Sequence, residues 1–165
     1  MNFEQEILVQ GSQFLRTCRL KRLKLATAES CTGGLIASLM TAIEGSSDIF
    51  DRGFVTYSNE AKIECLGVPF SMINKFGAVS EQVAEAMAEG ALANSNANLA
   101  LSVTGIAGPG GGTEHKPVGL VCIGSALIHS GTIVEKHIFS GDRDTVRNKT
   151  VARAVTILNR QALTY

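Results

Sequence analysis

The sequence predicts an α/β protein, a three-layer α/β/α sandwich whose mixed sheet includes one antiparallel hairpin. Short apolar runs alternate with segments of helical periodicity along most of the chain, as in strands that are connected by helices. Residues 117–128 are apolar at both alternating positions, which is typical of a central strand covered on both faces. Ser130-Gly131 predicts a two-residue hairpin turn into a strand at 132–139, and such turns join antiparallel strands.

The amino-terminal half predicts two strands, each followed by a helix. Apolar residues at roughly helical spacing open the chain: Phe3, Ile7, Leu8, Phe14 and Leu15. A strand is expected near 23–28 and a helix near 33–43, which the sequence Gly45-Ser46-Ser47 ends. Residues 53–57 predict the second strand, and Ser58 is the expected N-cap of a short helix.

The carboxyl-terminal half predicts a longer helix, the remaining strands and a final helix. Ser80 is the expected N-cap of the longer helix, and residues 99–103 predict a buried strand. A glycine-rich loop at 105–116 leads to the central strand and its hairpin partner. The final helix is expected from about Asp144.

Composition narrows the classes of function. The 165 residues are expected to form one domain, residues 1–165. Fifteen basic and fifteen acidic residues cancel, and aromatic residues are sparse, so neither a nucleic acid nor a membrane is an expected partner. The four cysteines form no C-x-x-C pair, which indicates reduced thiols. No basic and apolar leader and no apolar run of ~20 residues is present, so we expect a cytoplasmic protein.

The segment 28–34, Ala-Glu-Ser-Cys-Thr-Gly-Gly, places a hydroxyl and a thiol between an expected strand and an expected helix. The first backbone N–H groups of a helix have no internal partner, and the helix dipole favours negative charge there. A nucleophile beside unpaired donors is half of an acyl-transfer site. Ligands of such sheets bind beyond the carboxyl ends of strands, where Ser30, Tyr57 and Thr104 are expected.

Several familiar catalytic signatures are absent from the chain. There is no G-x-S-x-G elbow, and Ser30 has no lysine three residues later. The glycine run 108–112 is not followed by Lys-Ser/Thr, which excludes a Walker loop. His115, His129 and His137 lack the spacing of metal ligands, so we expect neither a metal nor a cofactor.

Lys62 is the candidate general base. It follows Tyr57 by five positions, in the first turn of an expected helix, where the dipole and burial both disfavour a protonated amine. Such a lysine can accept a proton, and it could reach Ser30 if the two strands are neighbours. From the spacing alone, the favoured alternative is that Lys62 is an exposed helix charge and Tyr57 a packing residue.

Six blocks of the sequence, taken in order, resemble the carboxy-terminal domain family of the competence/damage-inducible protein CinA, and within it the stand-alone nicotinamide-nucleotide amidases. The blocks are TAESCTGG at 27–34, RGFVTYSNEAK at 52–62, GAVS at 77–80, SVTGIAGP at 102–109, KPVG at 116–119 and GDRD at 141–144. The resemblance runs from about residue 24 to the final helix. Family members often carry a second, cofactor-binding-like domain ahead of this one, which is not expected here.

The resemblance implies an amidohydrolase that converts nicotinamide mononucleotide to nicotinate mononucleotide and ammonia in pyridine-nucleotide salvage. The family's nucleophilic serine corresponds to Ser30, and its catalytic tyrosine and lysine correspond to Tyr57 and Lys62. Cys31 is the rival nucleophile, although consecutive side chains point in different directions. Two alternatives stay open: a serine–lysine amidase for another small amide, or a nucleotide-binding module without turnover.

Substrate contacts are expected around the same cleft. Backbone donors of Cys31, Thr32, Gly33 and Gly34 would hold the oxyanion, and Thr104 and Gly105 would line the cleft. Arg143 and Arg147 lie four positions apart, hence on one helical face, and Arg147 is the favoured phosphate ligand. The loop 105–116 could close over the substrate or could simply be a mobile crossing, and the sequence does not choose between the two. Apolar content on both sides of strands in so small a domain favours a homodimer.

Overall fold

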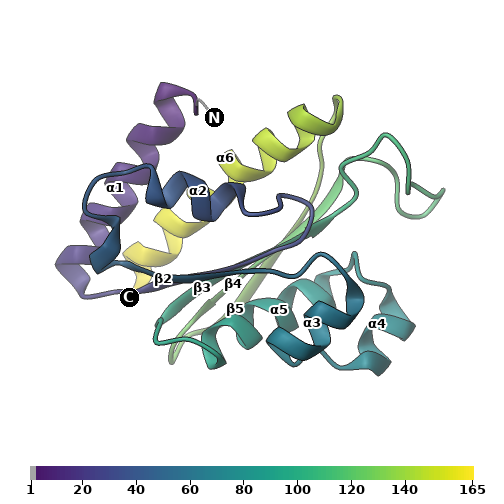
Figure 1. Ribbon diagram of the computed structural model, residues 1–165, viewed down its shortest axis with the longest axis horizontal. Helices are drawn as coiled ribbons and strands as arrows, with labels where there is room; N and C mark the ends of the chain where they lie inside the picture. Colours follow the sequence, from purple (N-terminus) through teal and green to yellow (C-terminus); the bar gives the residue numbers. More distant parts are fainter. Residues whose placement is uncertain (1–2) are drawn as a thin grey trace.

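A five-stranded mixed sheet forms the centre of the computed structural model, which describes residues 3–165 (Figure 1). The spatial order of the strands is β2-β1-β3-β4-β5. β1 pairs in parallel with β2 and β3, whereas β3, β4 and β5 pair antiparallel. The strands are β1 Leu25–Glu29, β2 Phe50–Val55, β3 Leu99–Gly105, β4 Leu120–Leu127 and β5 Gly131–Ile138.

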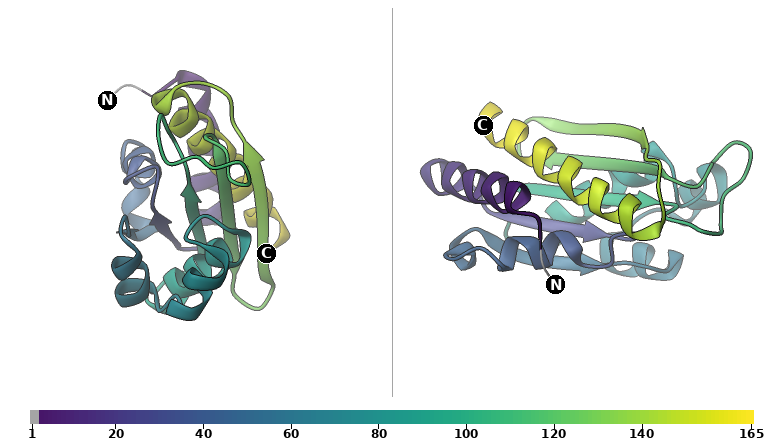
Figure 2. Two further views of the ribbon diagram at one scale, coloured as in Figure 1. Left: turned by 90° about the vertical axis from the view of Figure 1, so that its right-hand side faces the viewer. Right: turned by 90° about the horizontal axis from the view of Figure 1, so that it is seen from above.

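Helices cover both faces of this sheet, so the predicted three-layer α/β/α fold is confirmed (Figures 1 and 2). One face carries α1 Gln5–Lys21, α2 Leu35–Thr41 and α6 Arg143–Thr164. The other carries α3 Asn59–Leu66, α4 Phe70–Phe76 and α5 Glu81–Ala93. A short 3-10 turn, Ser46–Asp48, precedes β2. Across residues 3–165, no helix combines the length and the apolar character needed to cross a membrane.

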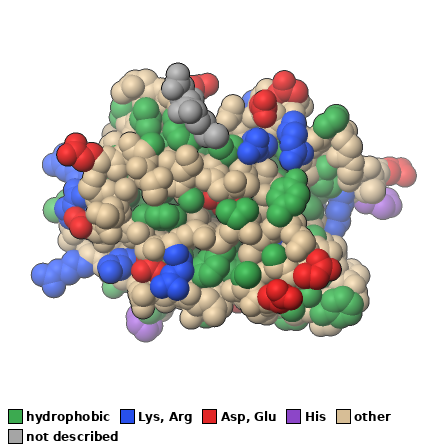
Figure 3. Space-filling view, in the orientation of Figure 1, with side chains coloured by type: hydrophobic (Ala, Val, Ile, Leu, Met, Phe, Trp, Pro, Cys, Tyr) green, Lys and Arg blue, Asp and Glu red, His purple; other side chains and the backbone are tan. Residues whose placement is uncertain are grey.

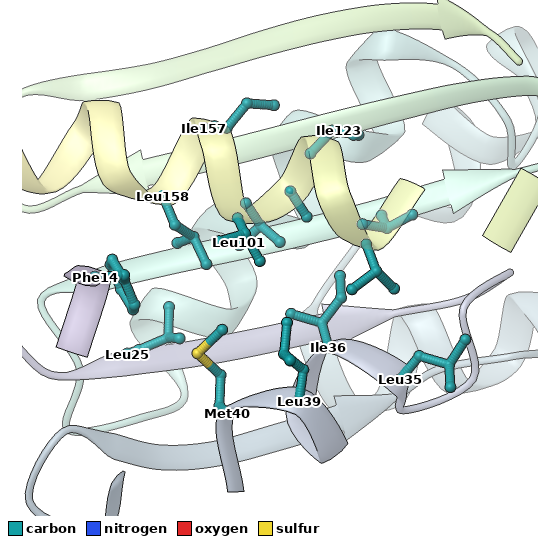
Figure 4. Packing of buried hydrophobic residues seen from close by; sticks show 14 of the residues in the cluster. Phe14, Leu25, Leu35, Ile36, Leu39, Met40, Leu101, Ile123, Ile157 and Leu158 are labelled. Atoms are coloured by element: carbon teal, nitrogen blue, oxygen red, sulfur yellow. The ribbon is translucent and has the colours of Figure 1, made fainter. Parts of the chain in front are cut away.

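The larger hydrophobic core lies between the sheet and the layer of α1, α2 and α6 (Figure 4). Side chains of the sheet and of these three helices meet there with no solvent exposure, among them Phe14, Ile36, Leu101 and Leu158. A smaller cluster packs α5 and the residues around α4 against the opposite face of the sheet. β4 is buried at every position, as its two-sided apolar pattern predicts. Truncating such a side chain typically costs 2–5 kcal/mol, so the sheet is a rigid support.

The predicted helix caps are confirmed. Ser58 Oγ accepts a hydrogen bond from Ala61 N–H at the start of α3, and Ser80 Oγ accepts one from Val83 N–H at the start of α5. α3 and α5 cross at Gly90, where a Cβ atom would collide with the carbonyl group of Leu66. The missing side chain therefore allows the close approach that fixes α3 against α5.

Two sequence predictions need correction, and one helix was not predicted. The predicted two-residue turn at Ser130-Gly131 is wrong, because Leu127 pairs with Gly131 and residues 128–130 form the loop. Its central residue, His129, adopts a positive φ of 64° that the sequence does not signal. β2 is one of the two edge strands, and it spans Phe50–Val55 rather than 53–57, so Tyr57 lies beyond its end rather than within it. Helix α4 was not predicted, because seven residues are too few to show a helical period.

Charged side chains of both signs are interspersed on the face shown in Figure 3. This distribution agrees with the balanced composition, in which basic and acidic residues are equal in number. A mixed surface of this kind produces no extended field of one sign. Local groups, rather than the overall field, must therefore provide whatever electrostatic selectivity the protein has.

Candidate active site

The candidate site lies where the parallel strands β1, β2 and β3 end together. Ser30 directly follows β1, and its N–H donates to Val103 O on β3 over 3.0 Å. On the other side, Thr56 N–H donates to Glu29 O over 2.9 Å. The backbone on either side of the Ser30 hydroxyl is thus held between both neighbouring strands. This is the position at which open α/β sheets bind ligands.

The Lys62 amine lies within contact range of the Ser30 hydroxyl, as the sequence predicts. The distance from Lys62 Nζ to Ser30 Oγ is 3.1 Å, although 32 positions separate the residues. Lys62 is 1% exposed and Ser30 is 9% exposed. The alternative interpretation of Lys62 as an exposed helix charge is therefore wrong.

The surroundings of the Lys62 amine are made of backbone carbonyl groups rather than carboxylates. Nζ lies 2.8 Å from Thr56 O and 3.4 Å from the carbonyl oxygens of Tyr57 and Ser58. No carboxylate oxygen among residues 3–165 lies within 4.0 Å of it. Burial lowers the pKa of Lys62, and the nearby Cys31 and Glu60 oppose that shift only in part. A neutral amine has a lone pair, so it can accept the hydroxyl proton.

Glu29 occupies the amino terminus of α2, which we expected from the sequence to be open. Its carboxylate accepts hydrogen bonds from the N–H groups of Gly34, Ile36 and Ala37 at 3.1, 3.1 and 2.8 Å. A carboxylate is stabilised there by the backbone donors and the helix dipole. Glu29 itself is only 1% exposed. The signal that could have revealed it is an acidic residue inside an otherwise apolar strand immediately before a glycine turn.

Two of the four expected oxyanion donors are already occupied. Gly33 N–H donates to Ser30 O over 3.1 Å, and Gly34 N–H donates to Glu29. Within residues 3–165, the N–H groups of Cys31 and Thr32 have no carbonyl or carboxylate acceptor. Only these two donors of the turn can therefore receive a developing oxyanion.

Cys31 is a poor rival to Ser30. Burial raises the pKa of its thiol to about 12, and the neighbouring Glu29 charge acts in the same direction. The thiolate is the nucleophilic form of cysteine, so a thiol that stays protonated is inert. Cys31 is 6% exposed, and its Sγ would lie 3.0 Å from a Cβ atom at Gly105, which indicates close packing.

A pocket of about 240 Å³ opens onto Ser30 and Lys62. Six predicted site residues line it: Ser30, Cys31, Tyr57, Lys62, Thr104 and Gly105. Four others do not line it: Thr32, Gly33, Gly34 and Arg147. The lining also contains residues outside the predicted set, namely Asn59, Ala78, Val79, Ala107 and Arg143. Ala78, Val79 and Ala107 lie in loops, and Asn59 and Arg143 are the first residues of α3 and α6, so no periodic pattern of the sequence marks them.

Tyr57 and the two arginines occupy distinct positions around this pocket. The Tyr57 side chain is exposed, and its hydroxyl oxygen accepts a hydrogen bond from Arg143 at 3.0 Å, so only its carbonyl group contacts Lys62. Arg143 also donates to Gly108 O over 2.8 Å. Arg147 instead donates to Thr32 O over 3.0 Å and lies 3.6 Å from an Asp144 carboxylate oxygen.

Comparison with known proteins identifies a family and solved structures that share this architecture. Residues 10–162 match the family model of the CinA C-terminal domain. The nicotinamide-nucleotide amidohydrolase PncC of Escherichia coli K12 is 45% identical over 160 residues, which cover 97% of each chain. A CinA-like protein of Syntrophobacter fumaroxidans is 51% identical over 135 residues, 82% of this chain and 32% of that protein.

The solved structures agree with the family match. The crystal structure of the competence/damage inducible protein CihA from Agrobacterium tumefaciens superposes with a TM-score of 0.94 at 44% identity and covers 96% of each chain. The chain spans about a third (35%) of the length of the first curated relatives it matches. The shared part is thus a domain that occurs both in longer proteins and in chains of about this length.

Proposed function

The chain belongs to the CinA C-terminal domain family, and from this membership and the site geometry we propose that it hydrolyses the carboxamide of nicotinamide mononucleotide. The products are nicotinate mononucleotide and ammonia, as in pyridine-nucleotide salvage. A similar chain of matching length is named for nicotinamide-nucleotide amidohydrolysis. The single observation that supports the chemistry most directly is the 3.1 Å contact between Lys62 Nζ and Ser30 Oγ in a buried environment.

Acylation begins when Ser30 Oγ attacks the carboxamide carbon while its proton passes to the neutral Lys62 amine. The carbonyl oxygen becomes an oxyanion, for which the N–H groups of Cys31 and Thr32 are the open donors. Loss of one such donor typically costs roughly 3–4 kcal/mol of transition-state stabilisation. When the tetrahedral intermediate collapses, the C–N bond breaks, and the departing nitrogen takes the proton from Lys62 and leaves as ammonia.

Deacylation repeats these proton transfers with water. Lys62, again neutral, accepts a proton from a water molecule that attacks the ester carbonyl. The C–O bond to Ser30 then breaks, and Lys62 returns the proton to Ser30 Oγ. Tyr57 contributes its carbonyl oxygen, which contacts the Lys62 amine, while Thr56 and Ser58 supply the other two carbonyl groups.

The test is an assay of ammonia release from nicotinamide mononucleotide, free nicotinamide and glutamine, with Ser30→Ala as the inactive control. Release from the mononucleotide alone supports the proposal. Release from another amide instead would assign the same serine–lysine chemistry to a different substrate. Tight binding of the mononucleotide without release would show a nucleotide-binding module.

The predicted homodimer is also part of this proposal. The apolar content of the strands in a small domain is its only support, and the mass of the particle in solution tests it. Light scattering at several protein concentrations should give twice the mass of the 17.4 kDa chain. A mass equal to that of one chain would overturn it.

A further inference from the structure

Two cationic side chains line the candidate pocket within residues 3–165, and they occupy different parts of it. Lys62 is buried and contacts Ser30. Arg143, the first residue of α6, is exposed and links the neighbouring loops through Tyr57 and Gly108. The pocket therefore has a reactive amine at one place and a guanidinium group at another.

Among residues 3–165, Arg143 forms no ion pair with an acidic side chain. Within the described part of the chain, no carboxylate oxygen lies within 4.0 Å of its guanidinium group. Both adjacent acids are engaged elsewhere, since Asp142 accepts from Thr145 N–H over 2.9 Å and Asp144 lies beside Arg147. The two acceptors of Arg143 are neutral oxygens. These oxygens fix the orientation of the guanidinium group without neutralising its charge. Because a guanidinium group has five N–H donors, others stay available for a ligand.

Arg147 is in the opposite situation. One of its nitrogens holds the carbonyl group of Thr32, another lies 3.6 Å from Asp144, and it does not line the pocket. Its Nε has no hydrogen-bond partner in the described residues, yet it is buried away from solvent. The geometry therefore favours Arg143 over Arg147 as a ligand for an anion.

We infer that Arg143 binds the phosphate monoester of the substrate and thereby selects nucleotides over nucleosides, an inference that rests on the proposed function. An oriented guanidinium group binds phosphate through two parallel charge-assisted hydrogen bonds. The amino terminus of the 22-residue helix α6 adds a favourable dipole at the same place. The Tyr57 hydroxyl is a positioning group here, because it contacts Arg143 rather than Lys62.

The experiment compares kcat/KM for nicotinamide mononucleotide and for nicotinamide riboside, which lacks the phosphate. Arg143→Gln should lower kcat/KM for the mononucleotide about 10- to 100-fold, mainly through KM, and leave the riboside value unchanged. Lys149→Gln is the matched control, because it removes an exposed cation of the same helix that does not line the pocket. Tyr57→Phe should raise KM for the mononucleotide by a smaller factor and retain kcat.

Three outcomes would overturn the inference. Equal losses for both substrates in Arg143→Gln would show a structural role. An unchanged preference for the mononucleotide would exclude Arg143 from phosphate binding. A preference lost instead in Lys136→Gln would place the phosphate in the neighbouring pocket of about 190 Å³, which Lys116 and Lys136 line.

Calorimetric binding of nicotinate mononucleotide to Ser30→Ala separates this inference from the proposed function. Adding Arg143→Gln to that protein should weaken binding by the same 10- to 100-fold, whether or not the unmodified protein releases ammonia. Weakened binding without any turnover would uphold the phosphate subsite and reject the amidase. Turnover with unchanged binding would uphold the amidase and reject the subsite.

Discussion

Lys62 is buried and Glu135 is partly buried, yet the two ionisable side chains have opposite surroundings. Glu135, on β5, accepts from Arg153 and Arg160 of α6 at 2.7 to 2.8 Å and lies 2.8 Å from His137. Although burial alone would raise its pKa, hydrogen bonds from Arg153, His137 and Arg160 lower the pKa of Glu135 to about 2. Lys62 has carbonyl groups around it and, among residues 3–165, no carboxylate oxygen within 4.0 Å; burial lowers its pKa, and the more distant Cys31 and Glu60 oppose this shift only in part.

The difference shows how the same fold makes one ionisable group inert and another reactive. Glu135 stays charged at every ordinary pH, and each of its oxygens is already paired. Lys62 is pushed toward its neutral form beside a hydroxyl group that it can deprotonate. The lack of a close carboxylate favours the neutral form of Lys62, which makes it the candidate base. The arginines of α6 that pair with Glu135 keep its carboxylate charged and join β5 to α6.

The largest expected effect comes from removing the reactive pair. Ser30→Ala should abolish turnover, and Lys62→Met should lower kcat by about 10²- to 10⁴-fold, the range typical of a lost general base. Steady-state ammonia release measures both, and Cys31→Ala should retain most of the activity. Activity that survives in Ser30→Ala and disappears in Cys31→Ala would transfer the nucleophile role to the thiol.

The next largest effect is expected in the pH dependence of the rate, which reports the protonation of Lys62. Protonation removes the lone pair of Lys62, so kcat/KM should fall about tenfold per pH unit below the pKa of Lys62. That pKa lies below the ordinary value of 10.5. Measurement of kcat/KM between pH 5 and pH 10, with thermal melts at each pH, gives this acidic limb while the protein stays folded. A rate that rises about tenfold per pH unit all the way to pH 10 would indicate an ordinary lysine pKa and contradict a neutral amine as the base.

Glu29→Gln should affect both stability and rate. The amide nitrogen cannot accept a hydrogen bond, so at least one N–H group of α2 loses its partner, at a cost of about 1–3 kcal/mol in the free energy of unfolding. The turn after Ser30 should loosen, which lowers kcat more than it changes KM. Denaturant unfolding and steady-state kinetics measure the two effects. Glu64→Gln, an exposed acid on α3, is the matched control.

The smallest effect is expected at Glu135. Because the partner arginines are partly exposed, Glu135→Gln should lower the unfolding free energy at pH 7 by only about 1 kcal/mol and leave kcat unchanged. The folded pKa of about 2 lies below the ordinary 4.5, so this stabilisation is fully present above pH 4.5 and is lost as the pH falls toward 2. The unfolding free energies of the unmodified protein and of Glu135→Gln, measured by urea melts, should therefore converge between pH 4.5 and pH 2. A difference that stays constant over this interval would show that the Glu135 carboxylate does not provide the stabilisation.

Local sequence patterns predicted the strands, every helix except α4 and the caps at Ser58 and Ser80, whereas the approach of Lys62 to Ser30 was expected from the family resemblance and not from spacing alone. The carboxyl ends of neighbouring parallel strands lie at the same edge of the sheet, so the residues that follow these strands lie close together. The role of Glu29 was not predicted, because a buried acid becomes a helix cap only when the chain folds back over it. Arg143 and Arg147 share one helical face, and only the packing of loops around α6 decides which of them reaches the pocket.

The crossing of α3 and α5 at Gly90 has a consequence for engineering the protein. Replacing a helical glycine with alanine ordinarily stabilises a protein by roughly 0.5–1 kcal/mol, so Gly90 is an obvious target for thermostabilisation. Here the added methyl group would collide with the carbonyl group of Leu66, four residues after Lys62 on the same helix. The gain in propensity would come with a displaced α3 and a longer gap between amine and hydroxyl, so a routine stabilising change would inactivate the enzyme that we propose.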